Sequence, residues 1–387
     1  MQGVVLKKGK EVIFENRHLW IFSGAIASYP SCFQNGHIYP VYSVAGELLG
    51  SAYFNKGQSL AGRVVARGNE DPMQALFSRL DEAIALRDKL FEATTTNAYR
   101  LVNGEGDGVA GLVIDQYGEY LVVQSGSLGM DFLKEKIVEY LVSKKRWKGI
   151  FEKSVTSSRK EEKLPERVAI LWGEDKEELE ILENGFKFKV SWRKGQKTGF
   201  FLDQREMRSQ VQTLSRGKRV LNVFSYSGGF SVYAMAGGAK GVDSLDISSQ
   251  AIQWAKENQG LNGFVEGRFL EEDAFTFLAK DPLDYDMIIL DPPAFAKKKQ
   301  DLPQASKGYR EINYQALSKM PKGSLLLTCS CSYHVGEELF QTLIFQAAKK
   351  AGRFVQVLSR HILAKDHPVN LFHPESHYLK SLFLYVS

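Results

Sequence analysis

The stretch LLLTCSCSYH (residues 325–334) places Cys329 and Cys331, two of the chain's three cysteines, one residue apart at the end of an apolar run. A cysteine thiolate is both a nucleophile and a metal ligand. Three roles are therefore open: covalent catalysis, metal binding together with His334, and packing as small buried hydrophobes. Metal binding is disfavoured because zinc needs a fourth ligand, and the sequence has no second cluster of suitable spacing.

A second chemical feature is the small-residue turn in VLNVFSYSGGF (residues 220–230), which follows a strand pattern and precedes a helical one. Its adjacent glycines, Gly228 and Gly229, lack the spacing of a dinucleotide fingerprint. The turn still predicts a nucleotide-binding loop, in which backbone at a helix N-terminus approaches the ligand. The alternative is a tight strand-to-helix turn that binds nothing.

Carboxylates end three further apolar runs. Asp246 follows Gly228 by 18 residues, close to the spacing of about 20 at which an acid accepts hydrogen bonds from ribose hydroxyls. An alternative is that Ser248 caps the next helix and Asp246 only occupies a turn. Asp273 is placed either to accept from an adenine amino group or to begin a helix. Asp291 is followed by two prolines, which stiffen the loop.

Parallel strands are the elements that would position these residues. From about residue 218, apolar runs alternate with helical patterns, as in an α/β sheet covered on both faces. Ligands of such sheets bind at the carboxyl ends of the strands, where the turn, the carboxylates and the thiols stand. The predicted buried strands are RVLNVFS (219–225), GVDSLDI (241–247), YDMIILDPP (285–293) and GSLLLTCS (323–330).

The first half of the chain predicts two further domains. Residues 1–70 contain short alternating stretches between turns, which indicates a small β-rich module. Asp71-Pro72 then opens a helix, and a hairpin turns at Tyr117-Gly118. The middle is therefore mixed α and β. Its other expected elements are a helix at 130–143, strands at 148–155 and 185–192, and an exposed charged loop at 159–167.

Composition is that of a globular protein. Of the 387 residues, 44% are hydrophobic and 25% are charged, and no apolar run reaches the ~18 residues of a membrane helix. The N-terminus lacks the apolar core of a signal peptide, so a location in the cytoplasm is expected. Three cysteines are too few for a disulfide framework, and a net charge of +5 permits a polyanionic partner.

In order along the chain, FSYSGGF, SLDIS, EDAF, LDPPAF and TCSCS resemble the motifs of class I S-adenosylmethionine-dependent methyltransferases. GQKTGFFLDQREMR resembles the segment before those motifs in the large-subunit (23S) ribosomal RNA cytosine methyltransferase I family. RHLWIFSGAI resembles that family's RNA-binding PUA domain, and YRLVNGEGDGVAGLVIDQYG resembles its central domain. The resemblance covers nearly the whole chain.

The resemblance implies a Rossmann-like methyltransferase sheet at 191–387, preceded by a PUA-like β-barrel at 1–70 and an α+β domain at 71–190. It implies methyl transfer from S-adenosyl-L-methionine to carbon 5 of a cytosine in 23S ribosomal RNA. The expected partner is large-subunit ribosomal RNA, a homodimer is left open, and no metal or membrane is expected.

The resemblance also implies roles for single residues. By the family's Ser-Cys-Ser pattern, Cys331 is the nucleophile that adds to carbon 6 of the cytosine, and Cys329 is a buried strand residue. Asp291 would bind the polar edge of the ring and take up its developing charge. The residues expected at the methyl donor are Phe224, Ser225, Tyr226, Gly228, Asp246, Ile247, Asp273, Ala274 and Asp291.

The Asp-Pro loop departs from that of better-known RNA cytosine methyltransferases, which place a second cysteine there to assist release of the thiolate. This chain has Pro292, Pro293 and Ala294 instead. Enzymes that methylate amino groups carry an aromatic residue directly after the prolines, and Ala294 occupies that place. An amino-methylating enzyme and a non-catalytic RNA-binding assembly factor remain the alternatives. The candidate RNA contacts are KKRWK (144–148) and AKKKQ (296–300), with solvated lysines as the alternative for both.

Overall fold

The computed structural model describes residues 2–280, 282–296, 298–376 and 378–387. The chain forms two compact units. Within the described ranges, none of the helices has the length and apolar character needed to cross a membrane. Unit 1 comprises Met1–Gly185, Val190–Asp203 and Ala364–His377, and unit 2 comprises Phe186–Lys189, Gln204–Leu363 and Tyr378–Ser387.

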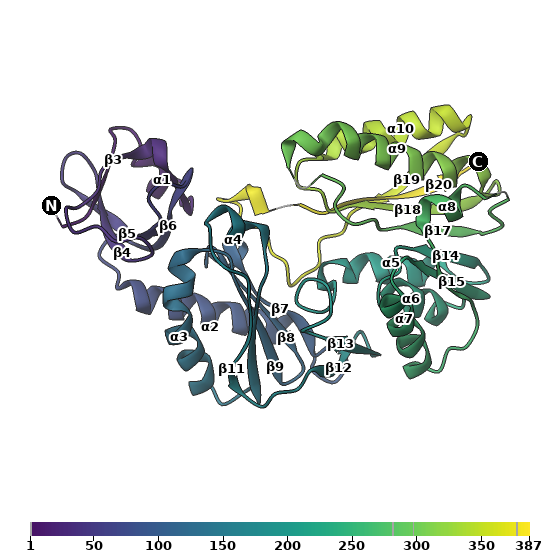
Figure 1. The fold of residues 1–387 in the computed structure, drawn as a ribbon, viewed down its shortest axis with the longest axis horizontal. Coiled ribbons are helices and arrows are strands. Elements are labelled where there is room, and N and C mark those ends of the chain that lie inside the picture. The colour runs from purple at the N-terminus through teal and green to yellow at the C-terminus, as the bar shows by residue number, and fades with distance from the viewer. Residues whose placement is uncertain (1, 281, 297, 377) are drawn as a thin grey trace. The chain divides into compact units, whose positions relative to one another are not determined.

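Unit 1 begins with a sheet of short strands, shown in purple in Figure 1. Its inward-facing residues, among them Val4, Ile21 and Val41, form a small apolar core. The predicted β-rich module is confirmed. Across the sheet the strands follow the order β2 (Trp20–Phe22), β6 (Leu60–Arg67), β5 (Leu48–Phe54), β4 (Ile38–Tyr42), β1 (Val4–Leu6) and β3 (Ile26–Ser28), and the helix α1 spans Val12–Glu15.

A second sheet of unit 1 packs against α2 (Pro72–Leu90) and α3 (Leu128–Ser143). Asp71 caps α2 by accepting hydrogen bonds from the backbone N–H groups of Met73 and Gln74, so the predicted helix start is confirmed. The hairpin, the predicted helix and the two predicted strands of this region also form. The sheet order is β11 (Arg167–Gly173), β10 (Gly149–Ser154), β9 (Tyr120–Ser125), β8 (Leu112–Tyr117) and β7 (Ala98–Asn103), and β12 (Glu178–Glu183) and β13 (Phe186–Ser191) follow in the chain.

The prediction of an exposed loop at 159–167 is confirmed for residues 163–166 and wrong at Arg159 and Glu162. The run begins inside the helix α4 (Ser157–Glu161), and Arg159 is completely buried. Its guanidinium donates to both carboxylate oxygens of Asp131, at 2.7 and 2.9 Å. The carboxylate of Glu162 is also buried and accepts from Arg63 at 2.6 Å. Hydrogen-bonded partners from distant parts of the sequence offset the cost of removing these charges from water.

Unit 2 is built on a sheet whose strands β16, β15, β14, β17 and β18 run parallel, while β20 lies antiparallel to β18 and β19. The four predicted buried strands correspond to β14, β15, β17 and β18, so the predicted parallel α/β sheet is confirmed. The sheet order is β16 (Phe269–Glu271), β15 (Gly241–Asp246), β14 (Arg219–Val223), β17 (Met287–Leu290), β18 (Ser324–Ser330), β20 (Lys380–Val386) and β19 (Val355–Arg360).

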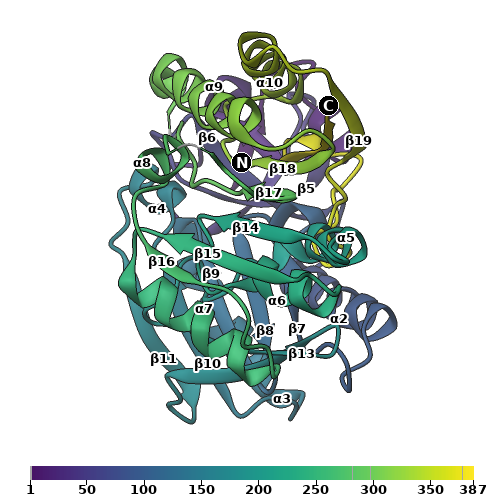
Figure 2. The same cartoon turned by 90° about the vertical axis from the view of Figure 1, so that its right-hand side faces the viewer.

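Alternating residues of these strands enter two apolar cores, one on each face of the sheet. Leu221 and Ile288 pack toward α8 (Ala274–Leu278), α9 (Leu302–Lys319) and α10 (Glu337–Ala351). Val220 and Met287 pack on the other face with residues of α5 (Arg205–Leu214) and α6 (Gly229–Ala236). Figures 1 and 2 show these layers, with α7 (Ser249–Leu261) beside α6. The helices cover the two faces of the sheet, so its carboxyl edge is accessible to a ligand.

Candidate active site

The register of unit 2 brings three loops together at the carboxyl edge of the sheet. Val223, the last residue of β14, pairs with Leu245 of β15 on one side and with Leu290 of β17 on the other. The next residues are Phe224, Asp246 and Asp291, which therefore start neighbouring loops. The chain order reverses at β14, and such a switch point is where open α/β sheets bind ligands.

The loop after β14 has an unusual backbone. Phe224 and Tyr226 have φ angles of 61° and 46°, in a region that side chains other than glycine rarely adopt. Gly228 has a φ of 77°, and a Cβ there would lie 3.0 Å from the Cα of Ala255 in α7. Such conformations persist only where the surrounding structure stabilises them, and they cluster at binding sites.

Asp246 holds this loop in place. Its Oδ2 accepts a 3.0 Å hydrogen bond from the backbone N–H of Tyr226, and its Oδ1 accepts one from Ser248 N–H, also at 3.0 Å. Ser248 caps α7 by accepting from the N–H of Ala251 at 3.3 Å, so the predicted cap is confirmed, whereas a ligand-binding role of Asp246 stays a prediction. The cap and a ligand-binding Asp246 are compatible, because the half-buried carboxylate keeps lone pairs beyond the two used here.

Asp273 begins α8, where its Oδ1 accepts from the backbone N–H and the hydroxyl of Thr276 at 2.9 and 3.0 Å. The helix-start interpretation is thereby confirmed, and a contact with a ligand stays a prediction. Ala274 is buried next to it, whereas Ile247 is 71% exposed directly after Asp246. An exposed isoleucine at this edge is available to cover an apolar part of a ligand.

The β14 loop retains unused hydrogen-bonding capacity. The hydroxyls of Ser225 and Ser227 are buried and have no hydrogen-bond partner among the described residues. Buried hydroxyls are normally satisfied, and each exception calls for an explanation. These hydroxyls are available to a nucleoside-containing ligand, which carries hydroxyl and amine groups of its own.

The two cysteines at the end of β18 have different environments. Cys329 is fully buried in the apolar core with Leu327 and Phe383, which confirms the prediction of a small buried residue. Cys331 lies one residue past the strand end, is half-buried, and places its Sγ 3.8 Å from the carbonyl oxygen of Pro292. The thiol and the Asp-Pro-Pro loop therefore meet.

Two helices contribute residues that inspection of the sequence did not identify. The side chain of Gln204, just before α5, donates a 3.1 Å hydrogen bond to Oδ2 of Asp291. The hydroxyl of Tyr309, in α9, lies 3.0 Å from the hydroxyls of both Ser330 and Ser332. Burial raises the pKa of Tyr309, so its phenol is neutral and can donate. Tyr309 thus restrains the residues on either side of Cys331.

Lys380 is a third residue that the sequence analysis missed. It begins β20, pairs with Ser330 across the sheet, and donates to the carbonyls of Ser332 and Tyr378 at 2.7 and 2.6 Å. Burial lowers its pKa to about 8, while Cys331 and Glu337 act in the opposite direction by electrostatic attraction. A lysine at the start of the apolar strand KSLFLYV was the available signal.

The candidate RNA contacts also differ from each other. In 144–148, Lys144 and Lys148 each lie 2.6 Å from a carboxylate, of Asp81 and Glu119 respectively. In 296–300, Lys298 and Lys299 are exposed, and Lys297 lies outside the described residues. Paired lysines offer less net charge to a phosphate backbone, so the second stretch is the stronger candidate.

Comparisons with known proteins agree with this architecture. A family model for S-adenosylmethionine-dependent methyltransferases matches residues 136–362, and a model of the PUA-like domain matches residues 4–67. The chain is 38% identical to proteins named ribosomal RNA large subunit methyltransferase I from Vibrio cholerae and Aeromonas salmonicida, over 98% of this chain and of theirs.

Two solved structures are similar over almost the whole chain. SMU.776 in complex with SAH has a TM-score of 0.84 at 25% identity, and a methyltransferase from Streptococcus mutans has a TM-score of 0.83 at 25% identity. Each match covers 99% of this chain and 100% of the other. The boundaries that the sequence analysis expected between the three domains, at residues 70 and 190, stay predictions. The chain belongs to the ribosomal RNA large subunit methyltransferase I family of S-adenosylmethionine-dependent methyltransferases.

Proposed function

We propose that this chain methylates carbon 5 of a cytosine in large-subunit ribosomal RNA, with Cys331 as a covalent nucleophile. One observation carries the proposal: the Sγ of Cys331 lies 3.8 Å from the carbonyl oxygen of Pro292, beside the loop that begins with Asp291. The relatives named ribosomal RNA large subunit methyltransferase I supply the substrate class.

The donor, S-adenosylmethionine, supplies a methyl group on a positively charged sulfur. Phe224, Ser225, Tyr226 and Gly228 would bind it through the loop after β14, with Asp246 on its ribose. The others proposed at the donor are Ile247, Asp273, Ala274 and Asp291. Because β14, β15, β17 and β18 are neighbours, the loops that follow them would bring the donor and the thiol close to one base.

The nucleophilic step follows from the weak reactivity of carbon 5 in cytosine. The Cys331 thiolate adds to carbon 6, which makes carbon 5 electron-rich enough to accept the methyl group. The carbon 5 proton then leaves to a base, and the thiolate is expelled as the ring double bond re-forms. Asp291, oriented by Gln204, would bind the polar edge of the ring.

Lys380 acts as a positioning residue in this scheme. An ammonium group close to a thiol favours the thiolate, which is the reactive form. Its hydrogen bond to the carbonyl of Ser332 also restrains the residue after Cys331. The lysine therefore favours the thiolate by its charge and restrains the residue after it by a hydrogen bond.

The position of Phe295 supports methylation of carbon rather than of an amino group. Its ring centroid lies 4.7 Å from that of Tyr309, and it is partly buried against the core of the sheet. The aromatic side chain nearest the two prolines is thus used in packing instead of stacking on a base.

The proposal is tested with RNA that contains 5-fluorocytosine. Fluorine cannot leave as a proton, so the adduct between enzyme and RNA should survive denaturation and map to Cys331 by peptide mass. Bisulfite sequencing of ribosomal RNA with and without the gene should show the loss of one 5-methylcytosine. An adduct on Cys329, or methylation found on an amino group by nucleoside mass spectrometry, would overturn the assignment.

A further inference from the structure

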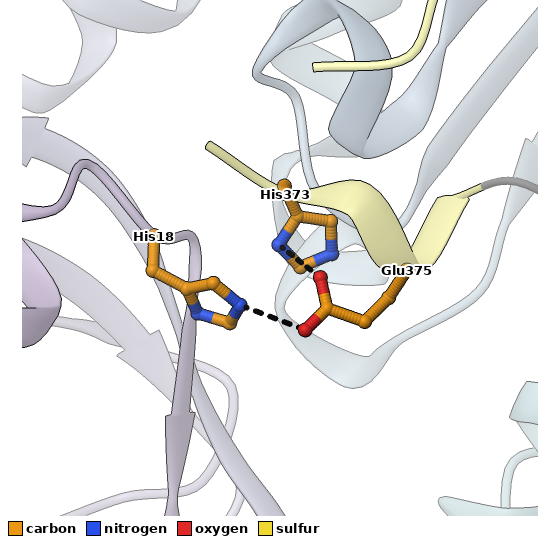
Figure 3. Close-up of side chains that lie close together, drawn as sticks. All are labelled: His18, His373 and Glu375. Carbon is orange, nitrogen blue, oxygen red and sulfur yellow. Dashed lines mark hydrogen bonds and ion pairs between the residues drawn. The ribbon is translucent and has the colours of Figure 1, made fainter. Parts of the chain in front are cut away.

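Unit 1 contains a cluster of two histidines and one glutamate that methyl transfer does not use. His18 precedes β2 in the N-terminal sheet, whereas His373 and Glu375 belong to the segment 364–377. Figure 3 shows the carboxylate of Glu375 between the two imidazole rings. His18 and Glu375 are 357 positions apart in the sequence, so only the folded chain brings them together.

The donor atoms of this cluster have the spacing of metal ligands. Nε2 of His18 lies 3.4 Å from Oε1 of Glu375, and Nδ1 of His373 lies 3.7 Å from Oε2 of Glu375. One ligand atom from each residue lies within 4.8 Å of the other two. With metal–ligand distances of about 2.0–2.2 Å, neighbouring ligands of a tetrahedral ion are about 3.3 Å apart.

The surroundings of His18 can orient it as a ligand. Its Nδ1 lies 3.3 Å from the carbonyl oxygen of Trp20 and 3.2 Å from the backbone nitrogen of the same residue. When Nδ1 carries the proton it donates to that carbonyl, and Nε2 then carries no proton and faces Glu375. Histidine ligands usually donate their second ring N–H to a carbonyl or carboxylate in this way.

Aromatic packing holds His373 in place. The ring of Trp20 stacks edge-on against His373 at 4.4 Å, and its indole N–H donates to Glu105 at 3.0 Å. His373 is fully buried, His18 has a side-chain exposure of 21%, and Glu375 one of 38%. The cluster is therefore anchored on one side and open to solvent on the other, where water could complete the coordination.

We propose that His18, His373 and Glu375 bind one divalent transition-metal ion of the zinc type. Two imidazoles and one carboxylate suit zinc and its first-row neighbours, whereas magnesium and calcium prefer oxygen ligands. The ion would join the N-terminal sheet to the segment 364–377 within unit 1. The site is independent of the proposed function, whose residues belong to unit 2.

The experiment is a calorimetric titration of the full-length, metal-free protein with Zn²⁺. The expected result is one site per chain, with an affinity that falls more than about 10-fold in His18→Gln and in Glu375→Gln, since replacing even a residue that only hydrogen-bonds to a metal ligand costs that much. Both replacements are close in shape, and circular dichroism checks that each variant is folded. His334→Gln is the matched control, because it tests zinc binding beside the accessible thiol of Cys331.

Cobalt provides a second readout that needs no substitution. Co²⁺ bound by nitrogen and oxygen should give visible d–d bands without the near-ultraviolet band of a thiolate ligand. The absence of zinc binding, unchanged affinity in His18→Gln and Glu375→Gln, or a thiolate band that only His334→Gln weakens would each overturn the proposal. Methyl transfer should be unaffected by either outcome.

Discussion

The Nζ of Lys380 donates a 2.7 Å hydrogen bond to the carbonyl oxygen of Ser332, one residue past Cys331. The lysine lies on β20 and the serine follows β18, and these two strands pair antiparallel. A buried cation is thereby held beside the proposed nucleophile. The groups that face it electrostatically are Cys331 and Glu337.

Lys380→Met should move the acidic limb of the pH profile of kcat/KM to higher pH, by about one unit, because the thiolate loses a nearby positive charge. Lys380→Arg keeps that charge and should restore the limb toward its wild-type position. Profiles measured from pH 6 to about 9.5 check this. Identical limbs in wild type and Lys380→Met would exclude an electrostatic role.

The stability of the protein should also depend on Lys380. Its pKa is lowered from 10.5 to about 8 by burial, so the unfolded chain binds more protons between these values. The free energy of unfolding of the wild type, relative to Lys380→Met, should therefore rise as pH increases from about 8 to about 10.5. Urea denaturation across that range measures the difference, and a fall with pH would contradict it.

Cys331→Ala should abolish methyl transfer while leaving binding of S-adenosylmethionine and RNA nearly intact, because the thiol acts in bond making. Cys329→Ala should keep its activity and lose about 1 kcal/mol of stability, as expected for a small cavity in a packed core. Turnover assays measure the activity of each variant, and calorimetry measures its ligand binding and its stability. Wild-type turnover by Cys331→Ala would remove it as the nucleophile.

Tyr309→Phe should lower kcat and reduce the free energy of unfolding by about 1–3 kcal/mol, since two buried hydroxyls lose a partner. The KM for S-adenosylmethionine should not change. Tyr314→Phe, on the same helix, is the matched control, because Tyr314 lies outside the Ser330–Ser332 contacts and packs its ring near Lys350. Equal effects of the two substitutions would show that Tyr309 has no special role.

Asp246→Ala should weaken S-adenosylmethionine binding by roughly 1.5–3 kcal/mol, the scale of hydrogen bonds to a charged acceptor. Asp246→Asn should lose less, because the amide oxygen still accepts from one backbone N–H. Calorimetry measures both, with Asp284→Asn as a control at an exposed aspartate that pairs with Arg219. Full affinity in Asp246→Ala would place the ribose elsewhere.

Replacing Lys298 and Lys299 with alanine should weaken RNA binding and flatten its dependence on log salt by roughly 0.7 for each lysine that neutralises a phosphate. Replacing Lys144 and Lys148, which are paired with carboxylates, should leave the slope nearly unchanged. Fluorescence anisotropy at several salt concentrations compares the two double variants. An unchanged slope in the first would remove these lysines from the interface.

The sequence by itself determined the strands of unit 2 and the ends at which chemistry would occur. Runs such as MIIL and SLLLTCS are mainly apolar, a pattern typical of a strand in a sheet covered by helices on both faces, and the motif residues follow those runs directly. The start of α2 was also predictable, because Asp71 caps the backbone N–H groups that follow it and Pro72 favours the first position of a helix. Both features depend on residues that are close together in the sequence.

The resemblance had already chosen Cys331 as the nucleophile, and the tertiary structure supplied the different surroundings of the two thiols. Cys329 and Cys331 have the same parity in the strand pattern, so alternation alone assigns both to one face. Pairing with β20 ends at Ser330 opposite Lys380, and Cys331 therefore leaves the ladder while Cys329 stays in the core. Tyr309 and the buried Arg159 follow no local pattern, because Ser332 and Asp131, which they contact, lie 23 and 28 positions away. Lys380 has a local signal, its place at the start of an apolar strand, but its contact with Ser332, 48 positions away, forms only in the folded chain.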